Sequence, residues 1–358
     1  MKSKLITLIL TLLTISVIAQ DVNNMPVREI LNETARKNIQ VPDILGYKTL
    51  KCDFHIHTVF SDGVVWPATR VDEAWQEGLD AIAITDHIEY PKKVMPKDRN
   101  MSYEIAKPRA EEKNIILIRG GEITRSMPPG HFNALFVTDL NALDTSDYMD
   151  AFQAANEQGG FIIWNHPGWK AQQPDTCKWW KLHTKLYEKG WLNGVEVFNE
   201  NEWFPIALDW CIDKNLAVIG TTDIHGIVAN LYNLEKYHRP MTLVFAEERS
   251  EEAIKKALFA KRTATWFGNN LAGKKEFLSA IFEKAVHIEL INKTPEGKKF
   301  VISNNSDIPF ILSSLKNSFT IPANGETLVT LIENEQTFTV KNLFIKGTEN
   351  LVVSIPLQ

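Results

Sequence analysis

Cysteine is scarce in this chain of 358 residues, which contains only Cys52, Cys177 and Cys211. An odd number of widely spaced cysteines does not make a disulfide framework, and it excludes a zinc site built on cysteine pairs. Cys52 and Cys211 lie in apolar stretches that are typical of buried positions. A metal site in this protein would therefore draw on histidine and carboxylate side chains.

An excess of basic residues is also lacking. The chain has 39 Lys and Arg residues against 44 Asp and Glu residues, which gives a net charge of −5. No stretch shows the clustered Lys and Arg that nucleic-acid binding requires. We therefore expect no nucleic-acid partner, and the acidic charge disfavours a proofreading nuclease.

Long apolar runs are missing apart from one segment near the N-terminus. Residues 5–18 are mostly apolar, follow Lys2 and Lys4, and are followed by Ala19. This pattern predicts a secretory signal peptide over residues 1–20. A single membrane anchor is the alternative, but the run is short for a bilayer span. We expect an exported protein with no stable membrane insertion after signal cleavage.

Predicted strands and helices alternate between residues 21 and 272, and polar residues gather just after the strands. This order is typical of an α/β barrel with its chemistry at the carboxyl ends of about seven strands. A doubly wound open sheet is the structural alternative. The predicted strands are 50–56, 80–85, 115–118, 134–137, 161–164, 194–198 and 217–220, and the predicted helices are 67–77, 102–113, 147–158, 205–214 and 251–260.

The pattern changes after residue 271, and residues 273–358 read as a small all-β sandwich domain. Short strand-like runs alternate with turn signals such as Pro295-Glu296-Gly297, and no helix is predicted there. The predicted strands are 287–292, 299–303, 309–313, 318–322, 327–332, 337–341 and 351–355.

Ligand-type side chains follow most of the barrel strands. His55 and His57 leave the first strand on the same side, so they can converge on one metal ion, and Asp62 follows in a Ser-Asp-Gly turn. A single histidine is usually a capping or hydrogen-bonded residue, but six of the nine histidines share this placement. The full set is His55, His57, Asp62, His87, Glu122, His131, His166, Asp223 and His225.

The order of these motifs resembles the polymerase and histidinol phosphatase (PHP) family. The resemblance covers residues 50–270 and rests on His55-Ile-His57, Ser61-Asp62-Gly63, Thr85-Asp86-His87, Gly121-Glu122, His131, Asn165-His166-Pro167 and Asp223-Ile-His225. It implies a distorted seven-stranded (β/α) barrel that holds two to three divalent metal ions and hydrolyses phosphoesters.

Carried over by position, the resemblance implies three metal sites. The first would use His55, His57, Glu122 and Asp223; the second Glu122, His131 and His166; the third Asp62, His87 and His225. In some relatives histidine stands at the position of Asp62, which bears on which metal binds. Mixed histidine and carboxylate ligands suit Mn, Zn or Fe.

Three further residues are candidates for direct roles. Asp86 is expected to orient a ligating histidine, with a helix N-cap as the alternative. Arg125 and Lys170 follow Glu122 and His166 and would contact the phosphate, unless they are solvated surface charges. Six tryptophans between residues 164 and 203 either line a substrate pocket or pack an extra helix onto the barrel.

Together these observations predict an exported metal-dependent phosphoesterase that hydrolyses small phosphodiesters with a metal-bound hydroxide at a trinuclear site. The layout resembles periplasmic PHP-type phosphodiesterases, so we expect the periplasm as location. A phosphomonoesterase and a non-catalytic surface glycan-binding protein are the alternatives. The sequence indicates a small phosphoester as the substrate and no particular oligomeric state.

Overall fold

The computed structural model describes residue 27 and residues 35–295, 297–332 and 337–355. The predicted signal peptide lies outside these residues. The described residues from Arg36 onward form one compact unit. Within the described part of the chain, no helix has the length and apolar character needed to cross a membrane.

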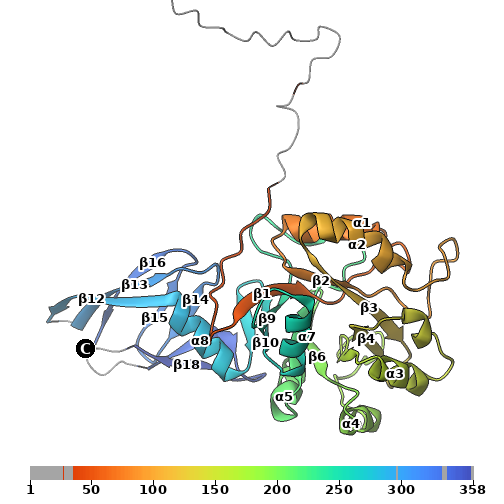
Figure 1. Cartoon of the computed structure of the whole chain (residues 1–358). Coiled ribbons are helices and arrows are strands. Elements are labelled where there is room, and N and C mark those ends of the chain that lie inside the picture. The colour runs from red at the N-terminus through yellow and green to blue at the C-terminus, as the bar shows by residue number, and fades with distance from the viewer. Residues whose placement is uncertain (1–26, 28–34, 296, 333–336, 356–358) are drawn as a thin grey trace, which may run out of the picture. The chain divides into compact units, whose positions relative to one another are not determined.

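The α/β part is built on one long, mixed sheet (Figure 1). β1, β2 and β3 pair in parallel, as do β5, β6 and β8, whereas β4 is antiparallel to both of its neighbours and β9 is antiparallel to β1. The strands are β1 (Lys48–Asp53), β2 (Ala81–Ile84), β3 (Ile116–Thr124), β4 (His131–Leu135), β5 (Phe161–Trp164), β6 (Gly194–Asn199), β7 (Glu202–Trp203), β8 (Ala217–Thr221), β9 (Met241–Ala246), β10 (Thr263–Phe267) and β11 (Asn270–Gly273).

The sheet curves until β8 lies against β9 and β10. The backbone amides of Val218 and Gly220 donate hydrogen bonds to the hydroxyls of Thr263 and Thr242, at 3.0 Å each. A Cβ on Gly220 would lie only 1.6 Å from Oγ1 of Thr265, so this approach requires glycine. The α/β architecture is as predicted, and the seven-stranded count of the barrel stays a prediction. The strands β7, β9, β10 and β11 were not predicted from the sequence.

Helices cover this sheet, and α1 and α2 lie side by side (Figure 1). α1 begins at Pro67, a favoured first helical residue because its missing N–H would lack a partner there anyway. Asp147 caps the helix predicted at 147–158, and Ser250 caps the one predicted at 251–260. The helices are α1 (Pro67–Gln76), α2 (Met101–Lys113), α3 (Tyr148–Glu157), α4 (Lys181–Glu188), α5 (Pro205–Asp213), α6 (Val228–Leu231), α7 (Glu251–Phe259) and α8 (Lys275–Ala285), with a 3₁₀ turn at Leu140–Leu143.

One prediction for the C-terminal region is wrong, because α8 is a helix beyond residue 271. It buries Phe277, Leu278, Ile281 and Phe282, whose spacing puts them on one helical face. This face packs into the hydrophobic core shared with β10 and the C-terminal strands. Charged residues lie between the apolar ones, so the helical spacing is hard to recognise next to a sequence that predicts short strands.

All seven strands predicted after α8 are present. β12 (Val286–Thr294), β13 (Gly297–Asn304) and β16 (Glu326–Leu331) form one antiparallel sheet. β14 (Phe310–Ser313), β15 (Ser318–Ile321), β17 (Thr337–Phe344) and β18 (Asn350–Ser354) form a second group. β17 also pairs in parallel with β11, so this second group continues the sheet of the α/β part.

Candidate metal centre

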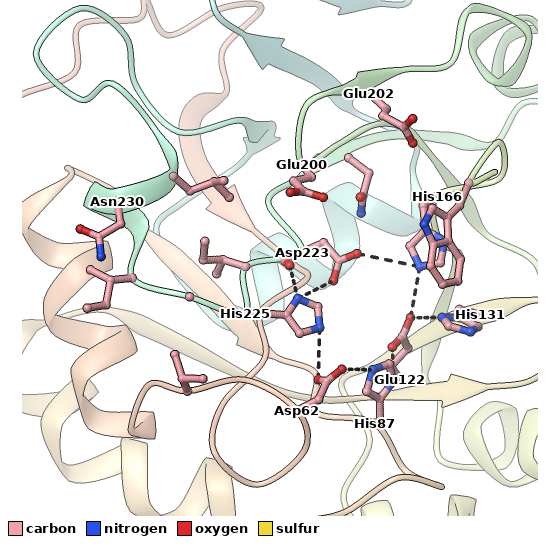
Figure 2. A pocket seen from close by; sticks show the side chains of 17 residues that line it. Asp62, His87, Glu122, His131, His166, Glu200, Glu202, Asp223, His225 and Asn230 are labelled. Atoms are coloured by element: carbon pink, nitrogen blue, oxygen red, sulfur yellow. Dashed lines mark hydrogen bonds and ion pairs between the residues drawn. The ribbon is translucent and has the colours of Figure 1, made fainter. Parts of the chain in front are cut away.

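The structure brings all nine predicted ligand side chains together at the carboxyl ends of the parallel strands. Figure 2 shows those that line the pocket, among them Glu122, Asp223 and His166. Three groups have ligand atoms within 4.8 Å of one another. They are His57, Asp62, His87 and His225; His55, His57 and Asp223; and Glu122, His131 and His166. The grouping differs from the predicted one in two ways: His57 also joins the group around Asp62, and Glu122 is not in the group of His55, His57 and Asp223.

The spacing within the second group suits a metal ion. Nε2 of His55 and Nε2 of His57 are 3.1 Å apart, and they lie 3.1 and 3.0 Å from Oδ1 of Asp223. Four ligands at ~2.0–2.1 Å around a zinc ion are about 3.3 Å from one another. Three donors held this close, of which His55 and His57 are fully buried, fit a shared cation.

Glu122 lies at the middle of the nine side chains. Its Oε1 is 3.5 Å from Nε2 of His55 and 3.2 Å from Nδ1 of His131, while its Oε2 is 2.5 Å from Nδ1 of His87. The side-chain amide of Asn165 donates to Oε1 at 2.8 Å. A bridging position between two sites is therefore open to this carboxylate.

The backbone around Glu122 explains its position. Sequence analysis ended the third strand at residue 118, but β3 continues to Thr124 and Glu122 lies within it. A Cβ on Gly120 or Gly121 would lie within 3 Å of the Leu135 or Ile88 side chain. The Gly-Gly pair thus lets neighbouring side chains pack closely against the strand, and it is no turn.

Arg70 fixes the loops that carry two of the groups. Its buried guanidinium donates hydrogen bonds to the backbone oxygens of His57 at 2.9 Å, Ile224 at 3.1 Å and His225 at 3.0 Å. A fourth bond goes to Gly226 at 2.7 Å. One side chain on α1 therefore ties the His-x-His loop to the loop after β8.

Two ligand candidates have left-handed backbones. The φ angles are +27° at His166 and +50° at Asp223. Residues other than glycine rarely adopt this conformation, and such strain gathers at functional sites.

The charges of the centre shift several pKa values. Burial opposes protonation of His55, but Asp223, Glu196 and Glu122 outweigh it and raise its pKa to about 10. Burial also lowers the pKa of His87, but Glu122 and Asp62 outweigh it and raise that pKa to about 11. Burial would raise the pKa of Glu122, yet His131 and His87 hold it well below its usual range. The carboxylates thus attract positive charge, which metal ions supply when they replace these protons.

Sequence analysis missed Glu196, a fully buried carboxylate on β6. It accepts hydrogen bonds from Nδ1 of His55 at 2.8 Å, the backbone amide of His166 at 2.6 Å and the hydroxyl of Thr221 at 2.6 Å. The available signal was a charged residue inside the apolar run Gly194-Val-Glu-Val-Phe198.

Asp86 organises the loop after His57 instead of touching a histidine. It accepts hydrogen bonds from the amide and hydroxyl of Thr58, both at 2.7 Å, and from the hydroxyl of Ser61 at 2.7 Å. Ser61 in turn lies 3.3 Å from Nδ1 of His57. Asp86 therefore influences the ligand candidate His57 through Ser61.

The two predicted phosphate contacts are not brought to the centre. The Arg125 guanidinium pairs with Glu89 at 3.1 Å and donates to the backbone oxygen of Thr145 at 2.7 Å. Lys170 is exposed and does not line the pocket over the nine ligands. Proximity to a ligand in sequence does not set the direction of the next side chains.

The tryptophans between residues 164 and 203 divide between the two predicted roles, which are packing a helix and lining the pocket. Trp164 is fully buried, and the centre of its ring lies 3.7 Å from the ring centre of His183 and 5.4 Å from that of Trp210. These rings pack α4 onto the α/β part. Trp169 is 42% exposed and lines the pocket, with its ring 5.4 Å from that of His166.

A pocket of about 580 Å³ opens above the ligands. None of the described residues that line it is lysine or arginine. Besides seven of the nine ligand candidates, it is lined by Val64, Trp169, Asn199, Glu200, Glu202, Ile224, Gly226, Ile227, Asn230 and Leu231.

The chain is similar over its length to a solved two-domain protein from Bacteroides vulgatus that contains a predicted PHP-like metal-dependent phosphoesterase. The two are 44% identical, the match covers 90% of this chain and 99% of that one, and the TM-score is 0.87. The chain belongs to the PHP-like phosphoesterase family. The predicted resemblance is thereby confirmed.

Two further comparisons cover parts of this PHP-like protein. Residues 283–356 match the family model of an Ig-like domain, in agreement with the predicted β-sandwich. The uncharacterized protein MJ1295 of Methanocaldococcus jannaschii is 40% identical over 82 residues, which are 22% of this chain. The match spans only 36% of that relative's length.

Proposed function

We propose that this PHP-like protein is an exported phosphodiesterase that hydrolyses small phosphodiesters at a trinuclear metal centre. The observation that carries the proposal is a pocket lined by seven of the nine metal-ligand candidates, with no lysine or arginine among the described residues of its lining. The metal ions alone would then neutralise the phosphate.

The charge of the substrate favours the diester. A monoester carries close to two negative charges at neutral pH, whereas a diester carries one. Enzymes that bind dianionic phosphate commonly add arginine or lysine contacts to the metal ions. A phosphomonoesterase is the nearest alternative, and the pocket wall offers no such contact.

The lining of the pocket also favours a diester, because outside the ligand groups it contains both apolar and charged side chains. Val64, Ile227 and Leu231 form an apolar wall, and each is about half exposed or more, at 67%, 49% and 48%. Trp169, Glu200 and Glu202 contribute an aromatic ring and two carboxylates to the lining. The apolar and the charged parts of the lining would give each of the two ester groups its own surface.

The proposed roles follow from the grouping of the ligands. His55, His57 and Asp223 would hold one ion, Glu122 with His131 and His166 a second, and Asp62 with His87 and His225 a third. Mn, Zn or Fe suit these donors. When bound, such ions lower the pKa of water and neutralise phosphoryl oxygens. Glu196 and Asp86 would hold ligands and loops in place.

The remaining expectations complete the proposal. Export to the periplasm rests on the N-terminal pattern of residues 1–20, and the domain boundaries would be 21–272 and 273–358. A surface glycan-binding protein without catalysis is disfavoured, because loss of catalysis would remove the selection that keeps nine ligands together.

The test combines metal content with two substrates. Protein loaded with Mn, Zn or Fe should hold two to three ions per chain and cleave bis-p-nitrophenyl phosphate faster than p-nitrophenyl phosphate. His166→Ala should lose metal and activity, while His287→Ala, which removes an exposed histidine on β12, should keep both. Less than one metal per chain, or full activity in His166→Ala, would refute the assignment.

A further inference from the structure

Two carboxylates line the pocket without belonging to any ligand group. Glu200 and Glu202 stand at the turn between β6 and β7, and in Figure 2 they lie on the side of Asp223 and His166. Among the described residues, none forms a hydrogen bond or ion pair with either side chain. Both negative charges therefore face the pocket and its solvent.

These charges do not fit the binding of phosphate alone. Asp62, Glu122 and Asp223 already supply three negative charges to the proposed metal ions. Two to three divalent ions would leave this centre with a small positive charge, which suits a phosphodiester anion. Two further carboxylates repel that anion, so they would weaken its binding unless the substrate carries positive charge beside them.

The backbone gives an independent reason to assign a role to Glu200. Asn199 pairs with Glu202, which leaves a two-residue turn, and Glu200 has a φ of +52°. Glycine and asparagine fit such a position best, because a larger side chain is strained there. A glutamate is thus present against the local preference, with its side chain lining the pocket.

Trp169 adds an aromatic ring to the same part of the pocket. Its ring lies 5.4 Å from that of His166, and Glu202 is on the His166 side of the pocket in Figure 2. Ammonium groups bind aromatic faces and carboxylates together, because both present negative potential to the cation. No anionic group is recognised in this way.

We propose that Trp169, Glu200 and Glu202 bind an ammonium group on one ester alcohol of the substrate. The substrate class is then phosphodiesters of amino alcohols, such as phosphocholine esters, with the second ester group on the wall of Val64, Ile227 and Leu231. This inference rests on the proposed phosphodiesterase function.

The experiment compares two esters of one shape on the metal-loaded, full-length protein. The first is hexylphosphocholine, and the second is hexyl 3,3-dimethylbutyl phosphate, in which carbon replaces the ammonium nitrogen. We expect kcat/KM to be on the order of tenfold higher for the choline ester. The preference should shrink as ionic strength rises, because salt screens exposed charges.

A double variant, Glu200→Gln with Glu202→Gln, should change the kcat/KM values of the two esters in opposite directions. It should lower kcat/KM for the choline ester and raise it for the neutral ester, since repulsion of the phosphate is removed. A loss of folding or metal would lower both. Glu326→Gln makes the same kind of charge change on exposed strand β16 and should leave the ratio as it is.

Calorimetry with phosphocholine and 3,3-dimethylbutyl phosphate tests the ammonium site without turnover. Tighter binding of phosphocholine that the double variant abolishes supports the inference. Equal binding and a kcat/KM ratio near one overturn it, even if bis-p-nitrophenyl phosphate is cleaved. Loss of one metal ion in the double variant also overturns it, because Glu200 and Glu202 would then be ligands. Failure to cleave any of these esters refutes the proposed function instead.

Discussion

Nδ1 of His55 lies 2.8 Å from Oε1 of Glu196, and Oε2 of the same glutamate accepts the backbone amide of His166 at 2.6 Å. One buried carboxylate therefore supports two ligand candidates from different strands. A proton on Nδ1 of His55, shared with Glu196, leaves the lone pair of Nε2 for a metal ion on the side of His57 and Asp223.

Replacing Glu196 should weaken metal binding while the direct ligands stay in place. Because a carboxylate behind a histidine orients the ring and raises its basicity, Glu196→Gln should lower metal affinity roughly 10–100-fold. Competition with a fluorescent chelator measures this affinity. Unchanged affinity would show that Glu196 has no influence on the ligand.

Replacing Arg70 should loosen two loops at once. Lysine cannot donate to the oxygens of His57, Ile224, His225 and Gly226 together, so Arg70→Lys should cost about 3 kcal/mol of unfolding free energy. Urea unfolding measures the loss, and metal affinity should fall with it. Arg109→Lys, at a partly exposed position on α2 where the guanidinium pairs with Asp72 and Glu112, is the control.

Buried His183 should make the protein less stable in acid. Burial lowers the pKa of His183 to about 4, so between pH 6.5 and pH 4 the unfolded chain binds a proton that the folded chain does not. The folded state should therefore lose about 3 kcal/mol over this range from His183 alone.

The contribution of His183 is isolated with His183→Gln, which keeps an acceptor for the amide of Trp180. Urea unfolding of metal-free protein at pH 7 and at pH 4.5 should show a smaller loss for the variant than for the native chain. Equal losses in both proteins would contradict the prediction.

Relief of the strained turn should stabilise the protein. Glu200→Gly removes the Cβ from a left-handed residue, which should raise the unfolding free energy by roughly 0.5–1 kcal/mol. Thermal unfolding would detect this gain. Lower stability in the variant would mean that the Glu200 side chain makes stabilising contacts.

Much of the centre is predictable because strand ends meet at one edge of a parallel sheet. An apolar run followed by His55-x-His57, His166 or Asp223 carries this information locally. β5 (Phe161–Trp164) agrees with its prediction at both ends for the same reason. The grouping of the ligands then followed from the motif order of the PHP family.

The misses have physical causes of their own. Glu196 looked like an ordinary strand residue, because its partners come from three other segments of the chain. Arg125 follows Glu122 closely, but its guanidinium is held by Glu89, which sequence spacing does not reveal. α8 was missed because its apolar face mixes with charges and lies next to a run of strands.

The pairing of β11 with β17 covers an edge of the α/β sheet with a strand of the Ig-like domain. β10 binds one edge of β11, and β17 binds the other through Leu271 opposite Leu343 and Ala272 opposite Phe344. A chain cut after residue 272 would present that second edge to other molecules. Open strand edges recruit further strands, so we expect the α/β part alone to self-associate and the C-terminal domain to prevent this by covering the edge.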